Sequence, residues 1–308
     1  MTGWGKTVKV DPSGCASKVV DIHGASGAAW MDRLPSIVAR SAQRWSLSIL
    51  PPFAELSYNY VAPAIGNDGR HVVVKAGVPH PELFREMAAL RWFDGQGIVR
   101  LLDADPAEGV LLLERLEPGT PLSEVEDDEE ATGIAARLMR VLWKAPPTEH
   151  DFATVAGWAA GLSKLRAHFE GGCGPFPTAL VDKAERLLEQ LIDTTAEQML
   201  IHGDLHHGNI LRSEREPWLA LDPKGVVGEP MWDAAYFSRS LLFEATDPKR
   251  LLVRRLDQLA AELGFDRSRL IAWGLAQSIL TGWWSFEDHG RGYEPDIACA
   301  EMFDRLAE

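Results

Sequence analysis

Two neighbouring stretches constrain this chain more than any others: His202–Leu211 (HGDLHHGNIL) and Trp218–Gly225 (WLALDPKG). Asp204 precedes Asn209 by five positions, and Asn209 precedes Asp222 by thirteen. Short apolar runs flank these polar residues and predict strands that end in turns. Turns of this kind would hold three oxygen-bearing side chains in one small volume.

These three side chains match the needs of phosphoryl transfer. The reaction requires Mg²⁺ to neutralise phosphate oxygens, and Mg²⁺ prefers hard oxygen ligands. We therefore predict that Asn209 and Asp222 bind the metal ion. Asp204 is predicted to accept the proton of the attacking hydroxyl group. His202 is expected to hydrogen-bond the backbone and hold the shape of the loop.

Two other interpretations of this stretch stay open. Any one of its polar residues alone would fit an ordinary turn between strands. A metal site built from His202, His206 and His207 is the second alternative, although no Cys or H-E-x-x-H partner supports it.

A lysine and a glutamate form a second candidate pair. The run His71–Lys75 predicts a strand that ends in the lysine, and Pro81 opens a predicted helix that reaches Phe93. Glu86 lies beside the apolar stripe of this helix. An inward-pointing acid needs a partner, because an unpaired buried charge is costly, and Lys75 is the candidate. A solvated glutamate at the edge of the stripe is the alternative.

Together these residues resemble the aminoglycoside phosphotransferases, in particular their streptomycin 6-kinase and hydroxyurea phosphotransferase branch. The resemblance rests on His202–Leu211, Leu221–Gly225 and Leu112–Leu122, and it extends from about Gly27 over most of the chain. It implies ATP and Mg²⁺ as cofactors and a small hydroxylated substrate. The leading candidate substrate is streptomycin or a related aminocyclitol. The alternative is hydroxyurea or a sugar or amino-alcohol metabolite.

The resemblance also implies an α+β fold with the two lobes of a kinase. Residues 1–115 would form a nucleotide-binding lobe with an antiparallel sheet, 116–120 a hinge, and 121–308 a mainly helical lobe with the catalytic loop and substrate site. Strands are expected at 46–50, 58–65, 71–75, 98–102 and 110–113. Helices are expected at 28–44, 81–93, 132–143, 152–169, 178–193, 232–243, 248–263, 267–286 and 295–306. The turn Asn67–Gly69 would join two of the strands.

By the same resemblance, nucleotide contacts fall on the first lobe. Lys75, held by Glu86, would neutralise the α- and β-phosphates. The main chain of Glu114 and Leu116 would read the adenine edge. The loop before the second strand lacks the glycines usual in kinases, and Ser57 is named there as a phosphate contact.

Further residues are expected to support the site. Asp233 is predicted to cap the helix that follows the metal ligand and to tie it to the catalytic loop. The acidic run Glu124–Glu130 is attributed to a helix N-terminus. Near the C-terminus, Trp283, Trp284 and Glu287 suit a cationic sugar-like substrate, and Glu287 is the predicted contact. Core tryptophans beside a solvated helix end are the alternative explanation of these residues.

The composition limits the kinds of partner that this chain is expected to bind. With 45 acidic and 31 basic residues, the net charge of −14 argues against nucleic acid. It suits a cationic substrate, although acidity also keeps proteins in solution. The three cysteines lack any C-x-x-C spacing, which fits a reducing compartment. No signal peptide and no long apolar run is present, so a cytoplasmic, monomeric enzyme away from membranes is expected.

Two other classes of protein remain. A nucleotide-binding module that has lost catalysis is disfavoured by the intact Lys75, Asp204, Asn209 and Asp222. A protein kinase is disfavoured because no A-P-E sequence follows Asp222.

Overall fold

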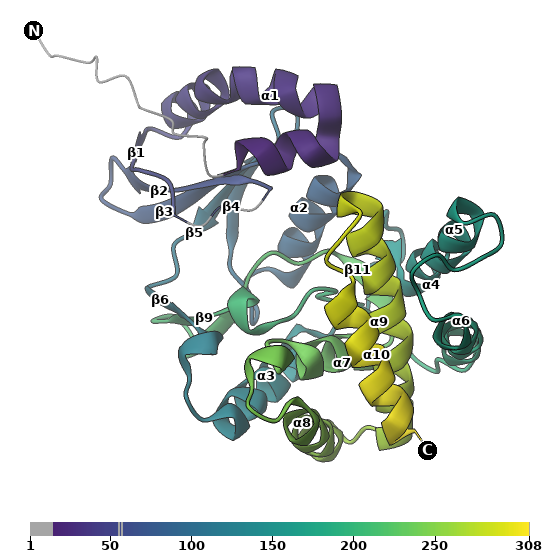
Figure 1. Cartoon of the computed structure of the whole chain (residues 1–308). Helices are drawn as coiled ribbons and strands as arrows, with labels where there is room; N and C mark the ends of the chain where they lie inside the picture. Colours follow the sequence, from purple (N-terminus) through teal and green to yellow (C-terminus); the bar gives the residue numbers. More distant parts are fainter. Residues whose placement is uncertain (1–14, 55, 57, 308) are drawn as a thin grey trace, which may run out of the picture. The chain divides into compact units, whose positions relative to one another are not determined.

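The computed structural model describes residues 15–54, 56 and 58–307 (Figure 1). The chain divides into two compact units. The first comprises the chain up to Gly95 together with Val99–Leu116, and the second comprises Gln96–Ile98 and the chain from Glu117 onward. The predicted α+β order is confirmed, because an antiparallel sheet comes first and a mainly helical region follows.

The first unit is built on a five-stranded sheet with the strand order β1-β2-β3-β5-β4. All neighbouring strands pair antiparallel. The strands are β1 (Leu47–Ile49), β2 (Tyr60–Gly66), β3 (His71–Ala76), β4 (Leu101–Asp105) and β5 (Val110–Glu114). The predicted turn joins β2 to β3, and it is closed by the main-chain hydrogen bond from Gly66 to Arg70, at 2.9 Å.

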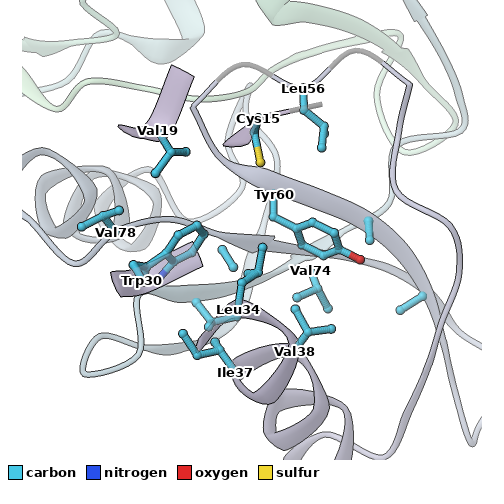
Figure 2. Close-up of a cluster of buried hydrophobic side chains, with 14 of the residues drawn as sticks. Cys15, Val19, Trp30, Leu34, Ile37, Val38, Leu56, Tyr60, Val74 and Val78 are labelled. Carbon is cyan, nitrogen blue, oxygen red and sulfur yellow. The ribbon is translucent and has the colours of Figure 1, made fainter. Parts of the chain in front are cut away.

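A long helix, α1 (Ala16–Arg44), packs against this sheet. Figure 2 shows its buried side chains beside those of β2 and β3. The cluster includes Val19, Trp30, Leu34, Ile37 and Val38 from the helix and Tyr60, Ala62, Val72 and Val74 from the strands.

The predicted start of this helix at residue 28 was wrong. The helix begins at Ala16 and changes direction at Gly24, which has φ 54° and ψ −132°. Glycine adopts such a conformation without steric cost, so the chain can place Val19 in the same core. The glycine-rich sequence around this bend hides the periodicity. Pro35 lies inside the helix.

Helix α2 (Pro81–Phe93) begins and ends where it was predicted. Pro81 occupies its first turn, where the missing N–H group is not needed. Asp94 ends it in the left-handed conformation, with φ 50°. Glu86 and Met87 lie on its buried face.

Helices dominate the second unit. They are α3 (Asp128–Leu142), α4 (Val155–Ala159), α5 (Gly161–His168), α6 (Thr178–Asp193), α7 (Met231–Arg239), α8 (Pro248–Leu263), α9 (Arg267–His289) and α10 (Glu294–Leu306). The predicted bounds of α6 and α8 are confirmed at both ends. The single helix predicted over 152–169 was wrong, because β7 (Ala153–Thr154) occupies its start and α4 and α5 are separate. The helix predicted over 232–243 ends early, at Arg239.

Two small sheets carry the stretch that we singled out in the sequence. One has the order β10-β9-β6, and the other has the order β7-β11-β8. Their strands are β6 (Pro118–Pro121), β8 (Met199–Ile201), β9 (Ile210–Ser213), β10 (Trp218–Ala220) and β11 (Val226–Gly228). The short strands predicted on both sides of the polar residues are therefore confirmed.

The acidic run has the structural role that we predicted. Asp127 caps α3 and accepts hydrogen bonds from the main-chain N–H groups of Glu129 and Glu130. Asp128 forms ion pairs with Arg254 and Arg255 of α8. The cysteines Cys15, Cys173 and Cys299 are buried thiols. Among the helices of the described residues, none has the length and apolar character needed to cross a membrane.

Candidate active site

The loop between β8 and β9 brings Asp204 and Asn209 together. The Nδ2 amide of Asn209 donates a hydrogen bond to the main-chain oxygen of Asp204, at 2.9 Å. The main-chain N–H of Leu221 donates to the main-chain oxygen of Asn209, at 3.0 Å, which places Asp222 next to the same loop. The three predicted side chains thus come from one connected segment of the second unit. Because the Nδ2 group of Asn209 donates this hydrogen bond, its Oδ1 atom is available as a metal ligand.

His202 holds the shape of this loop, as predicted. Its Nε2 atom lies 2.8 Å from the main-chain oxygen of Leu221, and its Nδ1 atom accepts a hydrogen bond from the N–H of Asp204, at 3.2 Å. Burial lowers the pKa of His202. A neutral ring is what this geometry requires, because one ring nitrogen donates and the other accepts.

Asp233 connects α7 to the same loop. Its carboxylate accepts hydrogen bonds from the N–H groups of His202 (2.9 Å) and Gly203 (2.8 Å) and from the indole of Trp143 (3.0 Å). Burial raises the pKa of Asp233, and the three donors oppose this shift. The predicted connection between Asp233 and the catalytic loop is confirmed. The predicted cap was wrong, because Pro230 is the N-cap of α7 and the carboxylate faces the loop.

Gly203 has no room for a side chain. Its φ is +85°, and an added Cβ atom would lie 2.7 Å from Val226 Cγ1 and 2.9 Å from Trp158 Cη2. Trp158 in turn packs against Trp232 and Trp284, with ring centroids 5.5 and 5.4 Å away. A wall of indole rings therefore supports the loop from the side of Gly203.

Asp222 has the left-handed backbone conformation, with φ 59°. Few residues other than glycine adopt this region, and asparagine and aspartate tolerate it best. Folding alone would favour glycine here. An aspartate kept at a strained position is typical of a functional site.

Lys75 and Glu86 form the predicted ion pair within the first unit. Lys75 Nζ lies 2.7 Å from Glu86 Oε1, and the two side chains are 4% and 9% exposed. The alternative of a solvated Glu86 was therefore wrong. Breaking a pair at this depth would leave an uncompensated buried charge.

Two of the other predicted nucleotide contacts, Glu114 and Leu116, lie at the end of the first unit. Glu114 ends β5, and its carboxylate accepts a hydrogen bond from the N–H of Arg100, at 2.9 Å. Leu116 is half-buried two residues later. Ser57 lies outside the described residues.

Glu287 is exposed in the last turn of α9. It borders a pocket of about 380 Å³ whose other lining residues are Lys164, Ala167, His168, Trp283 and Phe286. Trp283 itself is buried in the core, as one of the alternatives held. The pocket offers an aromatic wall beside one acid and one base.

The alternative metal site of three histidines is not supported. Across 15–54, 56 and 58–307, no group of three or more His, Cys, Asp or Glu side chains is arranged to hold a metal ion. His206 Nδ1 instead accepts from the N–H of Gly208, at 3.0 Å. His207 stacks on Phe237, with ring centroids 4.3 Å apart.

His207 is a buried neutral histidine. Its Nδ1 lies 2.9 Å from Ser240 Oγ, and its Nε2 lies 3.4 Å from Arg255 Nη2. Burial, followed by the charge of Arg255, lowers the pKa of His207 to about 3. Burial also lowers the pKa of Arg255 to about 10, while the carboxylate of Asp128 pairs with its guanidinium group.

Acid should therefore destabilise the protein through His207. The unfolded chain protonates this ring near pH 6.5 and the folded chain only near pH 3, so the unfolded state binds more protons in between. We expect His207 to lower the free energy of unfolding by up to about 1.4 kcal/mol for each pH unit below 6.5. Denaturant titrations at pH 7, 6 and 5 measure this slope. The His207→Gln variant should have a shallower slope, and an unchanged slope would refute the assignment.

Sequence reasoning missed Tyr236 and Arg239 of α7. Burial and then the negative charge of Asp204 raise the pKa of the Tyr236 hydroxyl, and the guanidinium carbon of Arg239 lies 4.6 Å from the centre of the Tyr236 ring. A spacing of three residues from Asp233 places Tyr236 on the loop-facing side of α7. That spacing was the available signal.

Comparison with known proteins identifies the family. The sequence model of the aminoglycoside/hydroxyurea antibiotic resistance kinases matches residues 53–290. The chain belongs to this family. The resemblance that we inferred from the motifs is thereby confirmed, and so is the enzyme class, a phosphotransferase of the aminoglycoside kinase type.

Relatives of this antibiotic resistance kinase cover nearly all of its length. A streptomycin 6-kinase of Streptomyces glaucescens is 32% identical over 289 residues, which are 92% of this chain and 93% of the relative. A hydroxyurea phosphotransferase of Kitasatospora aureofaciens is 35% identical over 295 residues, which are 91% of this chain and 81% of the relative.

Solved structures confirm the kinase-like fold. Choline kinase LicA from Streptococcus pneumoniae has a TM-score of 0.61 at 14% identity and covers 89% of this chain and 98% of its own. Aminoglycoside phosphotransferase APH(4)-Ia, solved as a thermostable mutant with ADP and hygromycin B, has a TM-score of 0.62 at 13% identity, with 88% and 98% coverage.

Proposed function

We propose that this kinase transfers the γ-phosphoryl group of ATP to a hydroxyl group of streptomycin or a related cationic aminocyclitol. The observation that carries the proposal is the convergence of Asp204, Asn209 and Asp222 on one braced loop of the second unit. The product would be an O-phosphorylated antibiotic that no longer fits its target. The enzyme would act as a monomer in the cytoplasm, where ATP is available.

Each group of the loop has a proposed task. Asp204 accepts the proton of the acceptor hydroxyl and aims its oxygen at the phosphorus. The Oδ1 atom of Asn209 and the carboxylate of Asp222 fit Mg²⁺, because they offer one neutral and one charged hard oxygen. When bound, Mg²⁺ would neutralise the phosphate oxygens. His202 and Asp233 keep the loop in the shape that these tasks need.

The first unit has the proposed nucleotide contacts. Lys75, held in place by Glu86, binds the α- and β-phosphates. The main chain of Glu114 and Leu116 binds the adenine edge, and Ser57 contacts phosphate. In this proposal 1–115 is the nucleotide-binding lobe, 116–120 is the hinge, and 121–308 binds the substrate.

The identity of the relatives and the charge of the chain support the cationic substrate. Streptomycin 6-kinases are 32% and 33% identical to the chain, and a net charge of −14 attracts cations. Hydroxyurea is the second candidate, because a hydroxyurea phosphotransferase is 35% identical. Hydroxyurea is neutral, so its binding would gain nothing from the acidic surface.

A panel of acceptors tests the proposal. ADP release from ATP is measured with streptomycin, hydroxyurea, simple sugars and amino alcohols, and Asp204→Ala serves as the control. We expect the wild-type enzyme to turn over streptomycin and the Asp204→Ala variant to lose this activity. Turnover with hydroxyurea alone would mean that hydroxyurea, the second candidate, is the substrate. Nucleotide binding without turnover on any acceptor would support an inactive module.

Glu287 is the proposed contact to the cationic substrate. The Glu287→Gln variant should raise KM for streptomycin about two- to fivefold, because a solvent-exposed ion pair contributes at most about 1 kcal/mol. The kcat and the KM for ATP should stay unchanged. Glu301→Gln on α10 removes another exposed acid and is the matched control. Equal KM values in both variants would place substrate recognition elsewhere.

A further inference from the structure

A buried arginine of α8 contacts the 3₁₀ turn that contains Asn209. This turn, η2 (His207–Asn209), follows Asp204 in the catalytic loop. Arg255 Nη2 lies 3.4 Å from His207 Nε2, and the two side chains are 2% and 3% exposed. Asn209 comes two positions after His207 in the same turn. A contact that fixes His207 therefore also restricts the position of Asn209.

Every N–H group of the Arg255 guanidinium has an acceptor. Nε and Nη2 donate to the carboxylate of Asp128, at 3.1 and 2.5 Å. Nη1 donates to the main-chain oxygens of Ser240, at 2.5 Å, and of Ser238, at 3.2 Å. The other Nη2 hydrogen is donated to His207. Asp128 begins α3, which packs on α8 (Figure 1). A planar group with all its donors in use has one orientation, so Arg255 is fixed in the second unit.

Arg255 also determines the tautomer of His207. A guanidinium group only donates, so His207 Nε2 must accept and Nδ1 must carry the hydrogen. Nδ1 lies 2.9 Å from Ser240 Oγ, which accepts this hydrogen. The ring stacks on Phe237, with centroids 4.3 Å and planes 19° apart. His207 is thus held at both nitrogen atoms and on one face, while Arg255 binds the main chain of the same Ser240.

The opposite side of the turn is bound to the rest of the site. Asn209 Nδ2 donates to the main-chain oxygen of Asp204, at 2.9 Å, and the main-chain oxygen of Asn209 accepts from Leu221, at 3.0 Å. These bonds hold Asn209 at the proposed metal site, and His207 holds the turn against α8. Support of this kind matters for a metal ligand, because the residues that orient ligands strongly affect metal affinity.

We propose that Arg255 is a positioning residue for the proposed metal ligand Asn209. It acts through His207 and Ser240, and Asp128 holds its guanidinium group in place. The packing of α3 on α8 thereby sets where the Oδ1 atom of Asn209 lies. This inference rests on the proposed role of Asn209 as a ligand of Mg²⁺.

The Arg255→Lys variant tests the first link. An ammonium group keeps the charge beside Asp128 but cannot also reach His207 and Ser240. Mn²⁺ takes the same hard oxygen ligands as Mg²⁺ and is detected by EPR, so it reports metal affinity in enzyme saturated with ADP. The Kd for Mn²⁺ should rise about tenfold, as for other residues that support metal ligands. Hydrogen exchange of residues 205–211 should be faster in the metal-free protein.

Arg254→Lys is the matched control. The neighbouring Arg254 also pairs with Asp128, but its other hydrogen bonds go to Thr132 and Gln258. Both variants should lower the Tm, whereas only Arg255→Lys should change the Kd for Mn²⁺ and the exchange of residues 205–211. Equal values of these two quantities in both variants would mean that the ion pairs only stabilise the fold, and would overturn the proposal.

Ser240→Ala tests the second link and does not depend on whether Arg255→Lys folds. It removes the acceptor of His207 Nδ1 and leaves the main-chain oxygen that binds Arg255. The Kd for Mn²⁺ should rise about threefold, because one neutral hydrogen bond is lost. Ser213→Ala on β9 removes another half-buried hydroxyl and should leave this Kd unchanged. A normal Kd in Ser240→Ala overturns the proposal.

The Asn209→Ala variant separates this inference from the proposed function. If Asn209→Ala binds Mn²⁺ normally, Asn209 is not a metal ligand and the proposed metal site fails. If Asn209→Ala binds Mn²⁺ weakly and Arg255→Lys binds it normally, only the positioning role fails. In the Asn209→Ala background, Arg255→Lys should weaken Mn²⁺ binding no further, because both changes act on the same ligand.

Discussion

Replacing Asp222 with alanine will abolish turnover of the Mg²⁺ complex of ATP. The substitution removes the charged member of the proposed metal site, and metal-ion neutralisation of the phosphates contributes several kcal/mol to the transition state. We therefore expect kcat/KM to fall by more than about 10³-fold. The measurement is ADP release at a series of Mg²⁺ concentrations.

A surface aspartate provides the control for this experiment. Asp193 is exposed at the end of α6, so Asp193→Ala should leave the rate unchanged. The Asp222→Ala chain should remain folded, because the interstrand contacts of β10 involve the residues before it. A near-normal rate in Asp222→Ala would end the metal assignment.

The second large effect is expected at Asp204. Asp204→Asn keeps the size of the side chain and removes the base, so kcat should fall by about 10²- to 10⁴-fold. The affinity for ATP should stay nearly constant, since Asn209 bonds to the main-chain oxygen of Asp204 and not to its carboxylate. Equilibrium nucleotide binding and steady-state kinetics on the same preparation measure the two quantities. A large loss of ATP affinity with kcat preserved would mean that Asp204 binds nucleotide instead.

Helices with clear end signals were predictable from the sequence. For α8, Asp247 caps the start, Pro248 fills the first turn, and Gly264 ends the helix with φ 73°. The segment 152–169 was not predictable in this way. Its first residues join a sheet because Ala153 pairs with Val226, far away in the sequence, and local periodicity does not contain such a partner.

In the site, too, some features could be predicted from the local sequence and others depend on tertiary contacts. The pair of Lys75 and Glu86 followed from the sequence, because an acid on an apolar helix face requires a base. The role of Asp233 was only partly predictable: its place after the proposed metal ligand Asp222 was clear, but its hydrogen bonds to the loop amides instead of to its own helix were not. The place of Tyr236 could have been inferred from its spacing of three residues from Asp233, whereas the ion pair between Arg239 and Asp296 forms only through the packing of the helices. No spacing in the sequence predicts this ion pair.

The backbone at Asp222 has a consequence for reading related sequences. Protein folding and the proposed phosphoryl transfer prefer different residues at this one position, because a left-handed turn is easiest for glycine and the proposed metal site takes its charged ligand from here. A relative that no longer transfers phosphate could have glycine here without backbone strain. The identity of this residue in a relative should therefore distinguish an active kinase from one that has lost phosphoryl transfer.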